Sequence, residues 1–299
     1  MAKQKEVKQE VVSSPPTGLQ VVWREFKKDK VALVSLIGLI VLIVGIFITA
    51  AFLDQKEIMT IRLRAKHAPP SPEFWLGADV GGRDIFGQLI IGAKNSLLIA
   101  IAITVITGVF GVLVGLVCGY FGGIIDNIFM RIIDFFITIP QLMIIIVFVT
   151  MIPKYDVVTF TGILCIFMWQ GTARLIRSKA LSESRRDYVS ASKTLGTNDF
   201  IIIIKEIMPN LSSIIIVELT LNFAGNIGIE TGLSYLGFGL PAKTPSLGTL
   251  VSYADNPLVL STYWWVWLPA SLLILVLMLG INYVGQALRR SADARQRLG

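Results

Sequence analysis

Histidine occurs once and cysteine twice among the 299 residues of this sequence. A zinc site of the H-E-x-x-H type needs two histidines on one helix, so that class of metalloenzyme is excluded. Cys118 and Cys165 both lie in apolar stretches, which favours two buried thiols over a disulfide or a metal-binding pair. We therefore expect no metal site in this chain.

Two patterns that would indicate an enzyme are also absent. No G-x-x-x-x-G-K-[ST] phosphate loop occurs, so the chain is not expected to bind ATP in that manner. The stretch 232–237, GLSYLG, does not match the G-x-S-x-G signature of a serine hydrolase. We expect no catalytic residue and no cofactor bound by the chain itself.

Charged side chains are scarce. They make up 16% of the chain, whereas hydrophobic residues make up 54%, and an ordinary soluble domain carries roughly 25% charged residues. This composition predicts an integral membrane protein, with membrane lipid around it. The net charge of +7 is then better explained by basic cytoplasmic loops than by binding of nucleic acid.

Six apolar segments predict an all-α fold with six transmembrane helices. As a helix, residues 31–53 would measure about 35 Å at ~1.5 Å per residue, enough to cross a hydrocarbon core of ~30 Å. The other five segments are 95–118, 127–152, 157–173, 211–229 and 264–288.

Basic residues predict the orientation of these spans. Residues 1–30 and 174–210 hold seven Lys or Arg each, and such residues concentrate in cytoplasmic segments. Loop 54–93 also holds basic residues, six of them if Lys94 is included, so the assignment depends on the whole set of loops. We expect a cytoplasmic tail (1–30), a first span (31–53), an extracytoplasmic loop (54–93), a core with five spans and a cytoplasmic loop at 174–210 (94–288), and a cytoplasmic tail (289–299).

Residues 182–210 form a patterned polar insert between two apolar segments. Apolar residues at 181, 188, 191 and 195 fall on one face of a helix, which predicts an amphipathic helix. Gly196 follows where a helix end favours a residue that tolerates positive φ. Asn198 and Asp199 are candidate N-caps of a second short helix, which Pro209 is expected to end. Ile201–Ile204 would suit a strand equally well.

Two sets of residues within the spans stand out. Gly111, Gly115 and Gly119 recur every fourth residue, which predicts a close approach of another helix. Three polar residues, also four apart, form a stripe along the fifth span, which could line a cavity or bond other helices. They are Glu218, Asn222 and Asn226.

Ionisable residues in apolar segments also suggest a transport pathway. They leave open an autonomous ion-coupled carrier that uses Glu218 or Asp134, although Arg131 lies one helical turn from Asp134 and could pair with it.

Five stretches resemble inner-membrane permease subunits of ATP-binding-cassette (ABC) importers, specifically the C-type subunit of the oligopeptide, dipeptide and nickel permease branch. Together they cover the chain from about residue 24 to its end. Ser190, Ser192 and Glu206 depart from the family's usual Glu, Ala and His. The stretches are Leu76–Asp79 with Gly82–Asp84, Gly119–Gly123 with Asp126, Tyr188–Ser192 with Leu195, Gly196 and Glu206–Asn210, Leu233–Gly239, and Asn282–Gly285 with Leu288 and Arg289.

The resemblance implies a type I permease fold in a bacterial plasma membrane, with both termini cytoplasmic, and transport of oligopeptides, dipeptides or nickel. It implies that residues 185–209 dock as a coupling helix on a cytoplasmic ATPase. Expected partners are a homologous second permease, two ATPase subunits that bind ATP and Mg²⁺, and an extracytoplasmic peptide-binding protein. The implied coupling residues are Tyr188, Ala191, Leu195, Gly196 and Pro209.

Overall fold

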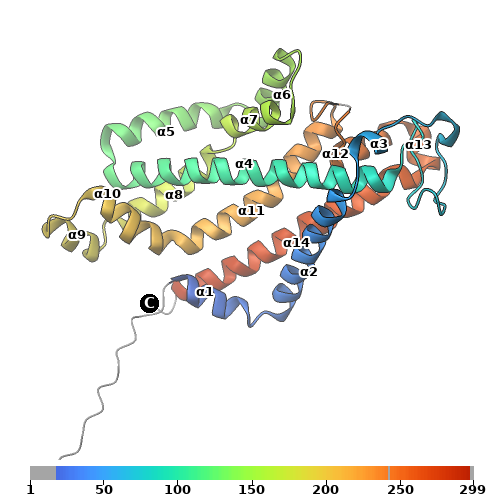
Figure 1. The fold of residues 1–299 in the computed structure, drawn as a ribbon. Helices are drawn as coiled ribbons and strands as arrows, with labels where there is room; N and C mark the ends of the chain where they lie inside the picture. Colours follow the sequence, from blue (N-terminus) through green and yellow to red (C-terminus); the bar gives the residue numbers. More distant parts are fainter. Residues whose placement is uncertain (1–17, 242, 297–299) are drawn as a thin grey trace, which may run out of the picture.

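The computed structural model describes residues 18–241 and 243–296, which fold as helices and connecting loops (Figure 1). Within these residues the only extended pairing is an isolated bridge between Ala78 and Asp84. The expected all-α fold is thus confirmed. The elements are α1 Gly18–Phe26, α2 Lys30–Ala51, α3 Gln55–Ile58, η1 Leu63–Ala65, α4 Ile85–Phe121, α5 Gly123–Thr138, α6 Gln141–Met151, α7 Val157–Phe167, α8 Gln170–Glu183, α9 Asp187–Thr194, α10 Asp199–Ile202, η2 Ile203–Ile207, α11 Met208–Tyr235, α12 Leu247–Ser252, η3 Tyr253–Asp255, α13 Pro257–Thr262 and α14 Trp264–Gln296.

Four continuous helical segments are long and apolar enough to cross a membrane: α2, α4, α10 to α11, and α14. A fifth is reached only if α5 and α6 count together, and these two helices bend by 85°. The break falls at Pro140, which has no N–H to donate and restrains the residue before it to extended backbone. The apolar segment 127–152 is therefore not one straight span.

The predicted span 157–173 is also divided. Helix α7 ends at Phe167 and α8 begins at Gln170, so neither helix alone has the length of a span. Both pack along α4. Six crossings remain consistent with this arrangement. In the described residues, however, only four segments are long and apolar enough to cross a membrane, or five if the bent pair counts as one.

Pro209 does not end the helix before it. The chain passes from α10 through a π-helical turn, Ile203–Ile207, directly into α11, with Pro209 in the first turn of α11. The wider turn accommodates a residue that cannot donate a backbone hydrogen bond. Ile201–Ile204, which could have formed a strand, are helical.

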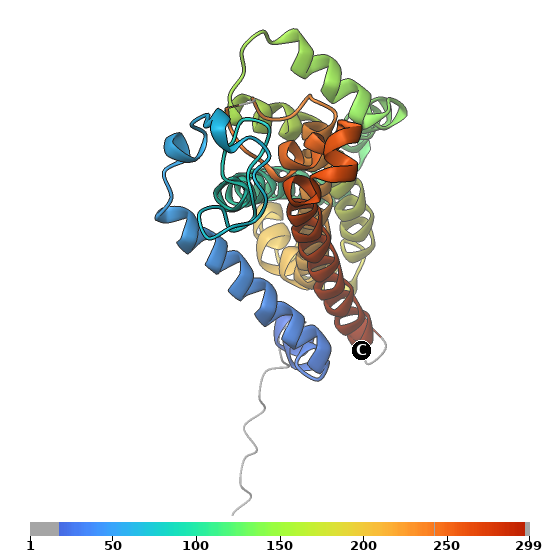
Figure 2. The same ribbon diagram turned by 90° about the vertical axis from the view of Figure 1, so that its right-hand side faces the viewer.

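Helices extend into both predicted tails within the residues that the structure describes. Residues 1–17 lie outside the described part, but α1 packs against α14 and α11, with Val22 and Phe26 buried. Helix α14 continues past Arg289 and Arg290 to Gln296. Figures 1 and 2 show α1 and the end of α14 together, away from α3 and α13.

Helices α4 and α8 are in backbone contact through the three spaced glycines. A Cβ atom added to Gly111 would lie 2.9 Å from Trp169 O, and one added to Gly115 would lie 2.7 Å from Ala173 O. At Gly119 the distance to Arg177 O would be 2.6 Å. Ordinary contact begins near 3.4 Å, so no larger residue fits without a shift of one helix.

A buried aspartate connects loop 54–84 to the helices at that end of the molecule. Asp79 accepts hydrogen bonds from the backbone of Gly81 at 2.8 Å and from Arg83 Nε at 2.8 Å. Gln88 and Tyr253 also donate to Asp79, at 3.1 and 3.3 Å. The loop is thereby fixed to both α4 and η3. The sequence marked this stretch by resemblance only and did not indicate the interaction.

Candidate translocation path and coupling surface

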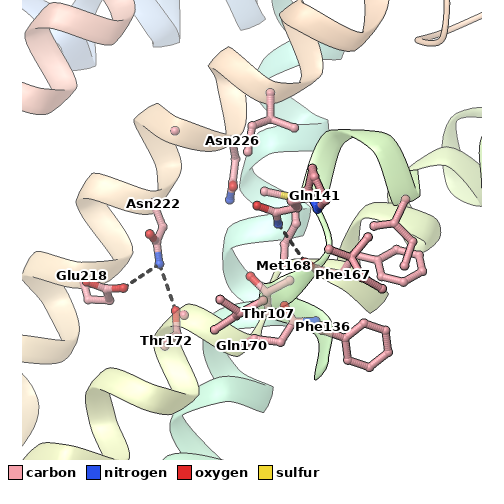
Figure 3. A pocket seen from close by; sticks show the side chains of 17 residues that line it. Thr107, Phe136, Gln141, Phe167, Met168, Gln170, Thr172, Glu218, Asn222 and Asn226 are labelled. Carbon is pink, nitrogen blue, oxygen red and sulfur yellow. Dashed lines mark hydrogen bonds between the residues drawn. The ribbon is translucent and has the colours of Figure 1, made fainter. Parts of the chain in front are cut away.

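A polar cavity of about 410 Å³ opens where the helices are broken (Figure 3). Its walls come from α4, from the break between α5 and α6, from the break between α7 and α8, and from the middle of α11. The broken helices thus leave room that straight, tightly packed spans would fill. Its polar lining residues are Thr107, Gln141, Gln170, Thr172, Glu218, Asn222 and Asn226.

All three members of the polar stripe on α11 line this cavity. Asn222 Nδ2 donates to Glu218 Oε1 at 3.2 Å and to Thr172 Oγ1 of α8 at 3.0 Å (Figure 3). Asn226 is buried and donates to Thr104 Oγ1 of α4 at 2.8 Å. Interhelical bonding and cavity lining, which the sequence left as alternatives, therefore occur together.

The opposite wall carries glutamines that the sequence did not indicate. Gln141, directly after Pro140, donates from Nε2 to the Phe167 carbonyl at 2.8 Å. This bond joins the two helix breaks and occupies one carbonyl that the end of α7 leaves without a helical partner. Pro140 was the one signal in the sequence that could have indicated this site.

A second cavity, of about 270 Å³, has residues of α8, α11 and α14 in its wall. Glu218 lines both cavities, and Lys179 of α8 and Arg289 of α14 line the second. The wall of the first cavity therefore contains one acid, and the wall of the second contains the same acid and two basic residues.

Asp134 is not placed for a transport role of this kind. The sequence had suggested Arg131 as its partner, but Asp134 pairs with Arg174 of α8. Nearby, Asp126 of α5 accepts from Arg177 Nε at 2.9 Å. Both ion pairs join α5 to α8, which lie side by side although α6 and α7 separate them in the chain.

The predicted amphipathic helix is divided in the structure: Leu181 lies in α8, and only residues 187–194 form α9, which Gly196 follows at φ 77°. The predicted apolar face is also wrong for α9. Its buried apolar residue is Val189, whereas Ala191 and Leu195 are exposed, Leu195 to 84%. Pro209 is exposed as well. The outward face of α9 is thus available to another molecule.

Contacts with the ends of the spans hold α9 in place. Burial raises the pKa of Tyr188 to about 12, so its phenol stays protonated and donates to Glu183 Oε1 at 3.0 Å. Ser192 Oγ donates to both carboxylate oxygens of Glu206, at 2.8 and 2.9 Å. Two of the residues that depart from the family pattern, Ser192 and Glu206, thus bond each other.

Several large apolar residues around this helix are exposed. Phe200 is 62% exposed, Ile204 54% and Ile201 45%, in addition to Leu195. We call these four residues the α9–α10 surface. Large apolar side chains gathered at one end of a molecule mark a site of interaction with a protein or a membrane.

Comparison with known proteins places the chain among transport components. Residues 111–298 match the family model described as "Binding-protein-dependent transport system inner membrane component". The chain belongs to this family. Residues 17–70 match a second model, the N-terminal transmembrane domain of oligopeptide transport permease C. The family match covers the α9–α10 surface, every residue that lines the second cavity, and every residue that lines the first cavity except Thr107.

Curated relatives of the permease cover nearly its full length. It is 51% identical to the oligopeptide transport system permease protein OppC of Lactococcus lactis subsp. cremoris, over 91% of this chain and 93% of that protein. It is 36% identical to the protein of the same name from Bacillus subtilis, over 92% and 90%. The dipeptide transport system permease protein DppC of Bacillus subtilis is 34% identical over 93% and 86%. The predicted resemblance is confirmed: the protein is a multi-pass permease of a bacterial membrane.

Proposed function

We propose that this permease is one subunit of an ATP-driven importer of oligopeptides or dipeptides and supplies half of its translocation path. The observation that carries the proposal is the cavity along α11, where Glu218 and Asn222 face open space in a helix long enough to cross the membrane. The names of the curated relatives support the class of substrate. Chains of this family are transport components, not enzymes, so hydrolysis of ATP is assigned to partner subunits.

Coupling to those partners is assigned to residues 185–209. Helix α9 and the turn at Gly196 present Ala191 and Leu195 outward, while Val189 anchors the helix inward. Because η2 joins α10 to α11 without a loop, the helices that contact a docked ATPase can move together with α11 as a rigid body. Pro209 lies in the first turn of α11, where the proposed coupling segment joins the span.

The proposed orientation follows from the distribution of charge. Residues 174–210 and residues 1–30 hold seven Lys or Arg each, which supports a cytoplasmic position for the α9 end. Helix α1 and the end of α14 lie away from α3 and α13 (Figure 1), so both termini are assigned to the cytoplasm. Loop 54–84 then faces outward, toward the expected peptide-binding protein.

The remaining alternative is an autonomous ion-coupled carrier. Asp134 is occupied by Arg174, which leaves Glu218 as its acid. Purification of the tagged chain from its own membrane, followed by mass spectrometry, separates the two. Co-purification of a second permease and of ATPases with phosphate loops supports the importer. A chain that arrives alone and takes up peptide under an ion gradient in proteoliposomes overturns it.

A further inference from the structure

Glu218 is the residue that the walls of the two cavities share. It lines the first beside Asn222 and the second beside Lys179 and Arg289. Of the 17 residues drawn around the first cavity in Figure 3, Glu218 alone carries a formal charge. A solute in the first cavity therefore meets one acid, and a solute in the second meets the same acid together with two bases.

No cation neutralises this acid within the described residues. Glu218 accepts one hydrogen bond, from Asn222 at 3.2 Å, and takes part in none of the ion pairs of that part of the chain. Asp126 and Asp134, in contrast, are each paired with an arginine. An unpaired acid within a membrane span is costly unless it faces water or a solute, and the spaces that Glu218 lines are the two cavities.

We propose that Glu218 selects the transported peptide by charge: it favours passage of ammonium groups and disfavours passage of carboxylates. The inference rests on the proposed function, since it concerns the peptide that the importer carries. Low-dielectric walls weaken the screening of a charge, so one acid can discriminate between peptides of equal size. Lys179 and Arg289 are placed to attract the carboxylate of a peptide whose ammonium has reached Glu218.

The test compares three labelled tripeptides, Ala-Ala-Ala, Ala-Lys-Ala and Ala-Glu-Ala, in cells whose own gene carries each variant. Maximal uptake rates are measured, and the rate in cells without the gene is subtracted. The ratio of Ala-Lys-Ala to Ala-Glu-Ala uptake is then compared between variants. Any preference of a binding protein is the same in every strain, so it cancels in this comparison.

Two variants should shift this ratio in opposite directions. Glu218→Gln removes the acid, and Gly225→Asp adds a second one on the same face of α11, where a Cβ meets nothing within 4 Å. We expect Glu218→Gln to lower the ratio by on the order of tenfold, equivalent to about 1.4 kcal/mol, and Gly225→Asp to raise it. Glu57→Gln, which alters a side chain 74% exposed outside both cavities, is the control and should leave the ratio unchanged.

Unchanged ratios in both variants would overturn the inference. So would an equal loss of all three peptides in Glu218→Gln together with an unchanged ratio in Gly225→Asp. If Glu218→Gln fails to reach the membrane, the direction of the shift in Gly225→Asp decides. Failure of the proposed function is a different result: deletion of the gene would then leave uptake of all three tripeptides unaltered.

Discussion

Substitution of Gly115 by alanine tests whether backbone contact between α4 and α8 holds the bundle together. The added Cβ would lie 2.7 Å from Ala173 O and 2.9 Å from Arg177 N. Both atoms belong to the backbone of α8, so no side-chain rotation can relieve the overlap. Helix α8 would have to withdraw to the 3.4 Å at which ordinary contact begins, and the contacts at Gly111 and Gly119 would open with it.

The chain offers a matched control for the intrinsic effect of the substitution. Gly162 lies within α7, and a Cβ added there meets nothing within 4 Å. Alanine in a helix interior is favoured over glycine by about 1 kcal/mol, so Gly162→Ala should be neutral or stabilising. Overpacking costs about 1–3 kcal/mol. The two variants should therefore differ by about 1–3 kcal/mol, with Gly115→Ala the less stable.

Thermal unfolding of the purified permease in detergent, followed by size-exclusion chromatography, measures this difference. At roughly 2–4 °C per kcal/mol for a chain of this size class, Gly115→Ala should unfold about 2–12 °C below Gly162→Ala. Equal melting temperatures, or a higher one for Gly115→Ala, would refute the argument that the glycines are required for close approach of α4 and α8.

Three further predictions concern the coupling helix, an ion pair and a buried phenol. Gly196→Val should abolish peptide uptake but leave the protein in the membrane, because a φ of 77° costs a residue with a Cβ about 1–2 kcal/mol. The control, Gly196→Asn, should retain uptake. Undiminished uptake by the valine variant would count against the coupling role. Asp126→Asn should lower the unfolding free energy by about 2 kcal/mol, as expected for a hydrogen bond to a charged group, and a double-mutant cycle with Arg177→Gln that showed full additivity would contradict this. Burial and the nearby Asp79 raise the pKa of Tyr253 to about 12, above its unfolded value of about 10, so its contribution to stability is complete below pH 10 and declines as pH rises toward 12. Between pH 8 and 11.5 the melting temperature should therefore fall more steeply with pH for the wild type than for Tyr253→Phe. An equal decline in the two proteins would exclude the effect.

Much of the fold followed from local pattern. Hydropathy indicated the four continuous spans to within a few residues at several of their ends, since α2 covers Lys30–Ala51 where 31–53 was expected. The spacing of glycines marked a helix face that does lie against α8, and the motif around Gly196 indicated a helix followed by positive φ. These features depend on residues close in the chain, so the sequence contains them directly.

The breaks in the helices could not be placed by hydropathy. An apolar window does not distinguish a straight span from two helices bent by 85° at Pro140, nor does it separate α7 from α8. Hydropathy also predicted the start of the second span at residue 95, whereas α4 begins at Ile85. The true start depends on Asp84, whose side chain caps the backbone N–H groups of Phe86 and Gly87. Pro209, conversely, looked like a helix end but is accommodated by a π-helical turn.

What the sequence by itself determined, then, is the composition of a membrane protein, its helical periods and the family to which it belongs. Tertiary structure alone decided which charges meet. Asp134 pairs with Arg174 and not with Arg131, because α8 folds back beside α5. Glu218 has no such neighbour within the described residues and instead lines two cavities. Ion pairs and cavities join residues far apart in the chain, and their partners are set by how helices pack.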